Sequence, residues 1–203
     1  MKTVSLLLLL AASQLSFGQN ATNVIAIGDW SAPVTHIFWS LRGRLLIYGA
    51  AEGQEHNWPH GRIYMELQNV RLAGGPPLEF YFDSDKSCLQ FEMRDGHDKL
   101  IPLVHGAYWG PVPAPFTITL PPESTIRMPV DFENQSSTKP NGLVLSIGAG
   151  RYWTIWTDST NDYYLSAAFS PSTNHPSALN YPIWQGTLQL PRVKIPVEKI
   201  NKS

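Results

Sequence analysis

The chain of 203 residues is 43% hydrophobic, 11% aromatic and only 15% charged, with a formal net charge of −1. This balance gives no electrostatic support for binding nucleic acid or an anionic membrane surface, because both require a basic patch. The aromatic content argues against intrinsic disorder. The 17 prolines and 15 glycines, scattered between apolar runs, are typical of a domain with many turns.

The N-terminus has the features of a cleavable signal peptide, in the order that secretion requires. Lys2 supplies a positive charge, Val4–Ala12 forms an apolar run, and small residues stand three and one positions before a cut after Gly18. The run is too short for a membrane span, which needs about 20 residues, and no later segment is apolar enough for one. We expect residues 1–18 to be removed and the protein to be secreted or periplasmic. A buried N-terminal helix is the alternative.

Apolar residues alternate with polar ones through most of the remaining chain, with the period of two that indicates β-strands. The first strand-like segment is Phe38–Tyr48, and the polar segment Glu52–His60 after it predicts a long loop. Further strands are predicted at 62–68, 78–82, 89–93, 116–120, 126–132, 143–147, 151–156, 163–169 and 183–190. Turn formers such as Gly74–Pro77, Asp95-Gly96 and Pro121-Pro122 separate these segments.

Many short strands with turns about ten residues apart are typical of an all-β sandwich or barrel. No amphipathic helix is predicted after the signal peptide. We therefore expect one all-β domain over residues 19–203, with a core between about residues 33 and 197. The predicted architecture is an antiparallel β-sandwich of roughly nine to eleven strands.

Cys88 is the only cysteine, so an internal disulfide is impossible and packing alone must stabilise the domain. The thiol is either a small core residue or exposed to solvent. Free cysteine is among the most frequently buried residue types, so we expect Cys88 in the core.

Several segments combine strand and turn signals in a recurring order. Ile63–Asn69 (IYMELQN) leads into Pro77-Leu78-Glu79-Phe80, and Leu89–Asp95 (LQFEMRD) leads through a turn to Ile101-Pro102. This order resembles immunoglobulin-like sandwich modules of exported bacterial proteins. The segments that resemble closing strands of such modules are Tyr163–Ser166 and Trp184–Leu188.

The first half is also distantly similar to the intracellular proteinase inhibitor family, whose fold is immunoglobulin-like. Together these resemblances extend over residues 61–197 and imply an immunoglobulin-like sandwich. The similarity to the inhibitor family also implies an inhibitory role. This chain differs from that family in its export signal and its greater length.

Candidate metal ligands occur at several places, but none has the pattern of a metal site. His56 and His60 are spaced as in helical zinc sites, yet Pro59 between them argues against a helix. Asp83-Ser84-Asp85 begins like a calcium loop that lacks the required glycine and glutamate, and Asp95–Asp98 is first of all a turn. The sequence therefore predicts no metal site, no cofactor and no catalytic residue.

Aromatic rings are the enriched chemistry that could bind a ligand, because flat rings on a sheet face can stack on sugars. If Trp153 and Ile155 face inward, neighbouring rings on the same strand face outward. The predicted ligand-binding residues are Trp58, Trp109, Tyr152, Trp156 and Tyr164. The alternative is that these rings pack beneath loops or against a partner domain.

Three functions stay open at this point. The first is an exported, non-catalytic protein that binds a protein or a polysaccharide. The second is a small hydrolase on a sandwich scaffold, whose candidate acids are Glu66, Glu79, Glu92 and Asp95. The third, implied only by the resemblance, is a proteinase inhibitor. We rank them in this order.

Overall fold

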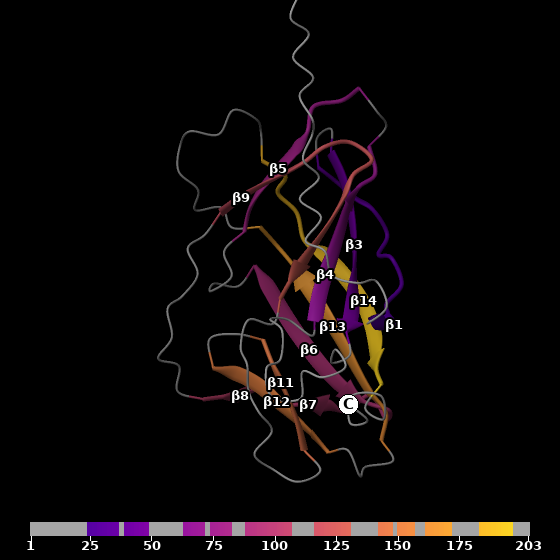
Figure 1. Cartoon of the computed structure of the whole chain (residues 1–203), viewed down its shortest axis with the longest axis vertical. Coiled ribbons are helices and arrows are strands. Elements are labelled where there is room, and N and C mark those ends of the chain that lie inside the picture. The colour runs from indigo at the N-terminus through magenta and orange to yellow at the C-terminus, as the bar shows by residue number, and fades with distance from the viewer. Residues whose placement is uncertain are drawn as a thin grey trace, which may run out of the picture.

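The computed structural model describes residues 24–36, 39–48, 63–71, 74–82, 88–106, 116–130, 142–147, 150–156, 161–171 and 183–196. These residues form an all-β structure whose strands pair antiparallel (Figure 1). None of the described segments forms a helix of the length and hydrophobicity that crossing a membrane requires.

Most of the strands are short, and each expected strand corresponds to one observed strand. Their bounds are β1 (Val24–Ile27), β2 (Val34–His36), β3 (Trp39–Tyr48), β4 (Ile63–Asn69), β5 (Leu78–Phe82), β6 (Leu89–Asp95), β7 (Leu100–Ile101), β8 (Val104–His105), β9 (Phe116–Leu120), β10 (Thr125–Pro129), β11 (Gly142–Ser146), β12 (Arg151–Trp156), β13 (Tyr163–Phe169) and β14 (Leu188–Ile195).

The large sheet contains β1, β3, β4 and β10 in that order, with β2 also paired to β3. β1 and β2 occupy two ends of the same edge of β3, since Val24 lies opposite Tyr48 and His36 lies opposite Trp39. Between them, the Ser31 N–H donates to the Gly43 carbonyl at 2.8 Å, and the Ser31 hydroxyl accepts from the Gly43 N–H at 3.1 Å. Residues 24–36 therefore form one interrupted edge strand, which the sequence pattern does not predict.

Three smaller sheets complete the described fold. The β13 sheet has the order β14-β13-β6-β7, the β12 sheet has the order β11-β12-β8, and β5 pairs with β9 in a ribbon. The expected strand at 183–190 is shifted, because Ile183 makes only an isolated bridge to Glu79 and β14 begins at Leu188.

Proline explains the irregular course of β14. Pro191 and Arg192 together lie opposite the single residue Ser166, because Leu165 pairs with Val193 and Ala167 pairs with Leu190. A bulge at the edge of a sheet accommodates a residue that has no N–H to donate. The apolar alternation thus continues across Pro191 to Ile195 rather than ending at Leu190.

Two strands leave the large sheet together at one corner. β4 pairs with β10, and their continuations β5 and β9 pair with each other in the ribbon at the upper left of Figure 1. Asn69 lies fully buried at this corner. Its side-chain nitrogen donates to the Leu120 carbonyl at 3.0 Å, and its side-chain oxygen accepts from the Arg71 N–H at 3.2 Å.

Asn69→Ala is expected to lower the free energy of unfolding by about 2 kcal/mol, because it leaves two backbone groups at the corner without their partner. Urea denaturation of the purified chain measures the effect. Thr125→Ala, an exposed position on β10, serves as the control and should change stability by less than about 0.5 kcal/mol. If the two variants unfolded with the same urea midpoint, the Asn69 side chain would not stabilise the corner.

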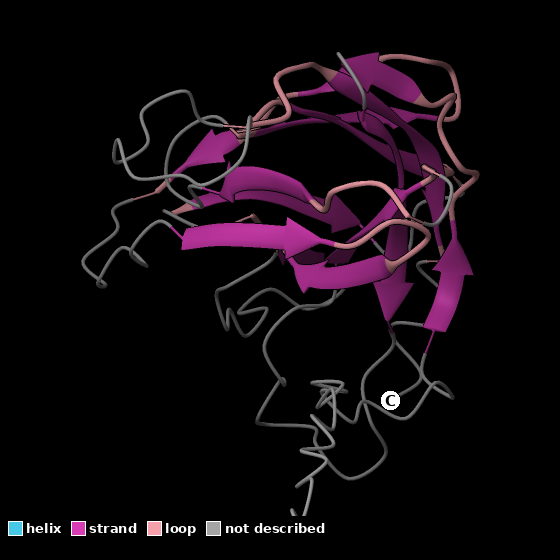
Figure 2. Ribbon diagram, turned by 90° about the horizontal axis from the view of Figure 1, so that it is seen from above, coloured by secondary structure: helices cyan, strands magenta, loops and turns pink. Residues whose placement is uncertain are grey.

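One apolar core joins all four sheets. Its members include Leu45 of the large sheet, Phe80 of the ribbon, Phe169 of the β13 sheet and Trp153 of the β12 sheet. Figure 2 shows the strands curving around this shared interior. Cys88 is buried in the same cluster, as expected for a lone thiol.

Candidate functional site

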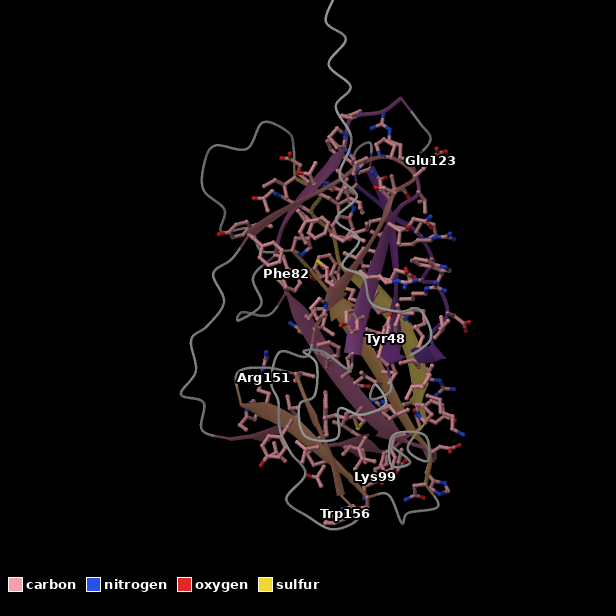
Figure 3. All side chains as sticks on the ribbon, viewed as in Figure 1. Tyr48, Phe82, Lys99, Glu123, Arg151 and Trp156 are labelled. Carbon is pink, nitrogen blue, oxygen red and sulfur yellow. The ribbon has the colours of Figure 1, made fainter. Side chains whose placement is uncertain are left out.

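The outward alternation predicted for β12 is confirmed. Trp153 and Ile155 are buried, whereas Trp156 is 46% exposed and Tyr152 is half-buried. Figure 3 labels Arg151 and Trp156 at the first and last positions of this strand. The other two predicted tryptophans, Trp58 and Trp109, lie outside the residues that the structure describes.

Tyr152 and Trp156 share one side of the β12 sheet, which we call the β12 face, with Thr154 between them and Val104 beside them. Val104 of β8 lies directly opposite Tyr152 and is 40% exposed. Residues opposite each other in a sheet point to the same side. Positions four apart on a strand are separated by about 13 Å. The rings of Tyr152 and Trp156 are therefore about this far apart, with the polar side chain of Thr154 between them.

Close packing positions the Tyr152 ring. A Cβ atom on Gly106 would lie 3.2 Å from Cε1 of Tyr152, so the ring packs against the bare backbone there. On the buried side of the strand, the Trp153 indole N–H donates to the Ile101 carbonyl at 3.1 Å. Both contacts tie β12 to the segment from β7 to Gly106 and hold the β12 face in place.

Tyr164 lies on a different sheet from Tyr152 and Trp156. It belongs to β13, opposite Arg94 and Lys194, and the Arg192 guanidinium lies 5.1 Å from its ring centroid. A hydrogen bond from Arg94 to Glu92 raises the pKa of that guanidinium above its usual range. The structure therefore separates Tyr164, with its charged neighbours, from the β12 face.

The segment Asp95–Asp98 is a turn, as expected. The Asp95 carboxylate accepts from the backbone N–H of Lys99 at 3.0 Å and of His97 at 2.9 Å. These bonds, that from Lys99 first, lower the pKa of Asp95 below its ordinary value. The ionised Asp95 carboxylate therefore contributes to the free energy of unfolding at pH values above its unfolded-state pKa. This contribution is lost as the pH falls through its folded-state pKa.

The outer side of the large sheet carries a planar polar array that the sequence reading missed. We call it the arginine face and define it by Trp30, Arg42, Arg44, Glu66, Gln68 and Arg127. Arg44 and Arg127 lie on either side of Glu66 in register, and each donates its Nε–H to that carboxylate at 2.5 Å. In the same way, Arg42 lies opposite Gln68 and donates its Nε–H to it at 2.7 Å.

The Glu66 side chain is only 3% exposed, and both of its carboxylate oxygens are paired with these two arginines. Its hydrogen bond raises the pKa of Arg127 above the usual range for a guanidinium. The Nη1 nitrogen of Arg127 also donates to the Tyr48 hydroxyl, at 3.3 Å. In the sequence, the only sign of this array is that polar residues occupy alternate positions of three strands. Which of these residues pair with one another becomes known only from the register of the strands.

The four acids considered for a hydrolase do not come together. Glu66 is on the large sheet, Glu79 is in the ribbon, and Glu92 and Asp95 are both on β6. Glu92 and Asp95 are three positions apart on one strand, so their side chains point to opposite sides. Glu79 is buried and accepts a hydrogen bond from the Thr119 hydroxyl at 3.3 Å. This arrangement does not support a two-carboxylate mechanism.

Among the residues that the structure describes, no group of three or more His, Cys, Asp or Glu side chains is placed to hold a metal ion. The histidine pair His56 and His60 and the segment Asp83–Asp85 lie outside those residues. No protein-family model matches this chain, and no curated protein or solved structure matches it.

Proposed function

We propose that this chain is an exported, non-catalytic protein with an immunoglobulin-like sandwich fold, and that it binds a polysaccharide through the β12 face. A protein ligand on the same face is the alternative. The charge, apolar run and small residues at the N-terminus support export to a secreted or periplasmic location. The antiparallel pairing of its strands around one core supports the sandwich.

The observation that carries the proposal is the exposure of Trp156. An indole that is 46% exposed leaves a large apolar area in water. Tyr152 and Val104 form a second apolar area on the same side, and Thr154 supplies a hydroxyl between the two rings. Rings that present a flat apolar face with polar groups beside it suit the mixed surface of a sugar, whose C–H groups stack and whose hydroxyls form hydrogen bonds.

The test is binding of the purified chain to a panel of neutral polysaccharides by calorimetry and affinity electrophoresis. Trp156→Ala is expected to weaken binding about tenfold, equivalent to about 1.4 kcal/mol, because the indole provides the largest stacking area. Tyr152→Ala should weaken it less, since that ring is already half-buried.

Phe116→Ala is the matched control. Phe116 of β9 is also 46% exposed but lies in the ribbon, so its loss should leave affinity unchanged. Binding that survives Trp156→Ala would place the ligand elsewhere. No binding to any polysaccharide, together with capture of a protein that Trp156→Ala abolishes, would favour the protein ligand.

A further inference from the structure

The three arginines of the arginine face each donate from Nε to a side chain on the neighbouring strand, and Arg127 also donates from Nη1 to the Tyr48 hydroxyl. Within the described part of the chain, the terminal nitrogens of Arg42 and Arg44 make no hydrogen bond, and none of them is a buried atom without a partner. These terminal nitrogens are therefore not buried, and the Arg44 side chain as a whole is 22% exposed.

The arginine face carries an excess of positive charge. The array contains three guanidinium groups and one carboxylate, because Arg44 and Arg127 pair with Glu66 whereas Arg42 pairs with the neutral Gln68. Asp29 precedes Trp30 in the chain, but no ion pair joins it to these arginines among the described residues. The excess of two positive charges lies on one side of a protein whose overall charge is −1.

The guanidinium groups are also held in place before any ligand arrives. The Trp30 ring centroid lies 4.7 Å from Cζ of Arg42 and 4.4 Å from Cζ of Arg44. Stacking on an indole restricts the orientation of a guanidinium, and the Nε bonds fix its remaining freedom. Groups that are already ordered lose little entropy on binding.

We propose that the arginine face is a second ligand site, which binds the carboxylate groups of an acidic polysaccharide through the terminal nitrogens of Arg42 and Arg44. The terminal N–H edge of a guanidinium matches a carboxylate with two parallel hydrogen bonds. Positions two apart on a strand are separated by about 7 Å, so the two arginines can engage successive charges on one chain.

The geometry favours a sugar acid over an acidic peptide. The carboxylate of a sugar acid is attached directly to a rigid ring, whereas aspartate and glutamate side chains must be ordered on binding. The arginine face spans the paired strands β3, β4 and β10, so a linear polymer can lie across them. Partly exposed Trp30 adds a flat ring beside the cations, on which a sugar can stack.

The experiment compares polygalacturonate with fully methyl-esterified polygalacturonate, which has the same backbone without the charges. The purified chain should bind the acidic polymer at least tenfold more tightly, and its affinity should fall as salt is raised. The double variant Arg42→Gln/Arg44→Gln should lose this preference. Arg192→Gln, which removes an exposed arginine from the β13 sheet, should keep it.

Equal binding of the acidic and esterified polymers would overturn this inference. So would equal binding of poly-glutamate or of a sulfated glucan, since neither carries carboxylates on a sugar ring. A preference that survives the double variant and is lost in Trp156→Ala would assign the ligand to the β12 face. That result would refute the second site and leave the proposed function intact.

Folding of the variants is checked by urea denaturation. If the double variant is destabilised, Arg42→Lys/Arg44→Lys replaces it, because lysine keeps the charge and lacks the planar fork. An intermediate preference for the acidic polymer is then expected. A preference equal to that of the wild type would overturn the assignment to the guanidinium edges.

Discussion

Trp184→Ala is expected to lower the free energy of unfolding by about 3–5 kcal/mol, because it removes the largest type of side chain from the core and leaves a cavity. The Trp184 ring is fully buried and lies parallel to Phe169, with an interplanar angle of 5° and centroids 6.3 Å apart. Its indole N–H donates to the Val34 carbonyl at 3.4 Å, and its backbone N–H donates to the Glu79 carbonyl at 3.0 Å. The residue thus contacts the large sheet, the ribbon and the β13 sheet at once.

Urea denaturation followed by circular dichroism measures this loss. The matched control is Trp156→Ala, which removes the same side chain from a site that is 46% exposed. That variant should lose less than about 1 kcal/mol, because much of its indole is already in water. If both tryptophan variants unfolded at the same urea concentration, Trp184 would not join the sheets in the way that its contacts imply.

Gly43→Ala should destabilise the protein by about 3 kcal/mol, the upper end of the usual cost of overpacking a core. A Cβ atom at this position would lie 2.7 Å from Cδ2 of Leu190, 2.8 Å from Cδ2 of Leu67 and 3.0 Å from Cδ2 of Leu188. Leu188 and Leu190 belong to β14, so β14 packs tightly over β3 at Gly43. All three leucines are buried and cannot move apart without disturbing their own neighbours.

Thermal unfolding of Gly43→Ala beside Gly96→Ala tests this explanation. An added Cβ on Gly96 would find its nearest neighbour 3.5 Å away, at Cβ of Asp162, which is ordinary contact. The Gly96 variant is expected to stay within about 0.5 kcal/mol of the wild type. A Gly43→Ala protein as stable as the wild type would mean that β14 can move away from β3 at little cost.

Local pattern was sufficient to predict most of the strands. The alternation in Ile63–Asn69 and Tyr163–Phe169 depends only on which residues are apolar, and both segments are strands in the structure. Residues 24–36 were missed because Gly28 and Pro33 interrupt the period, and the pairing there is completed by the Ser31 side chain. A pattern of residue types contains no information about such a bond.

The arginine face could not be predicted for a different reason. Glu66 is buried because Arg44 and Arg127 lie beside it, and these residues are 22 and 61 positions away in the chain. Only the register of β3, β4 and β10 brings the three together. The close approach of β14 to Gly43 is equally non-local, since a glycine between two arginines in the sequence gives no sign of the strand that crosses it.

The bulge at Pro191 affects whether molecules of this protein can associate edge to edge at high concentration. β14 is the last strand of the β13 sheet within the described residues, and an outermost strand offers backbone groups on which a second molecule can assemble. Here an incoming strand would meet a proline that has no N–H to donate, a local increase in twist, and the long side chains of Arg192 and Lys194. The bulge at Pro191 therefore makes the outermost described strand of this sheet a poor template for fibrous aggregation.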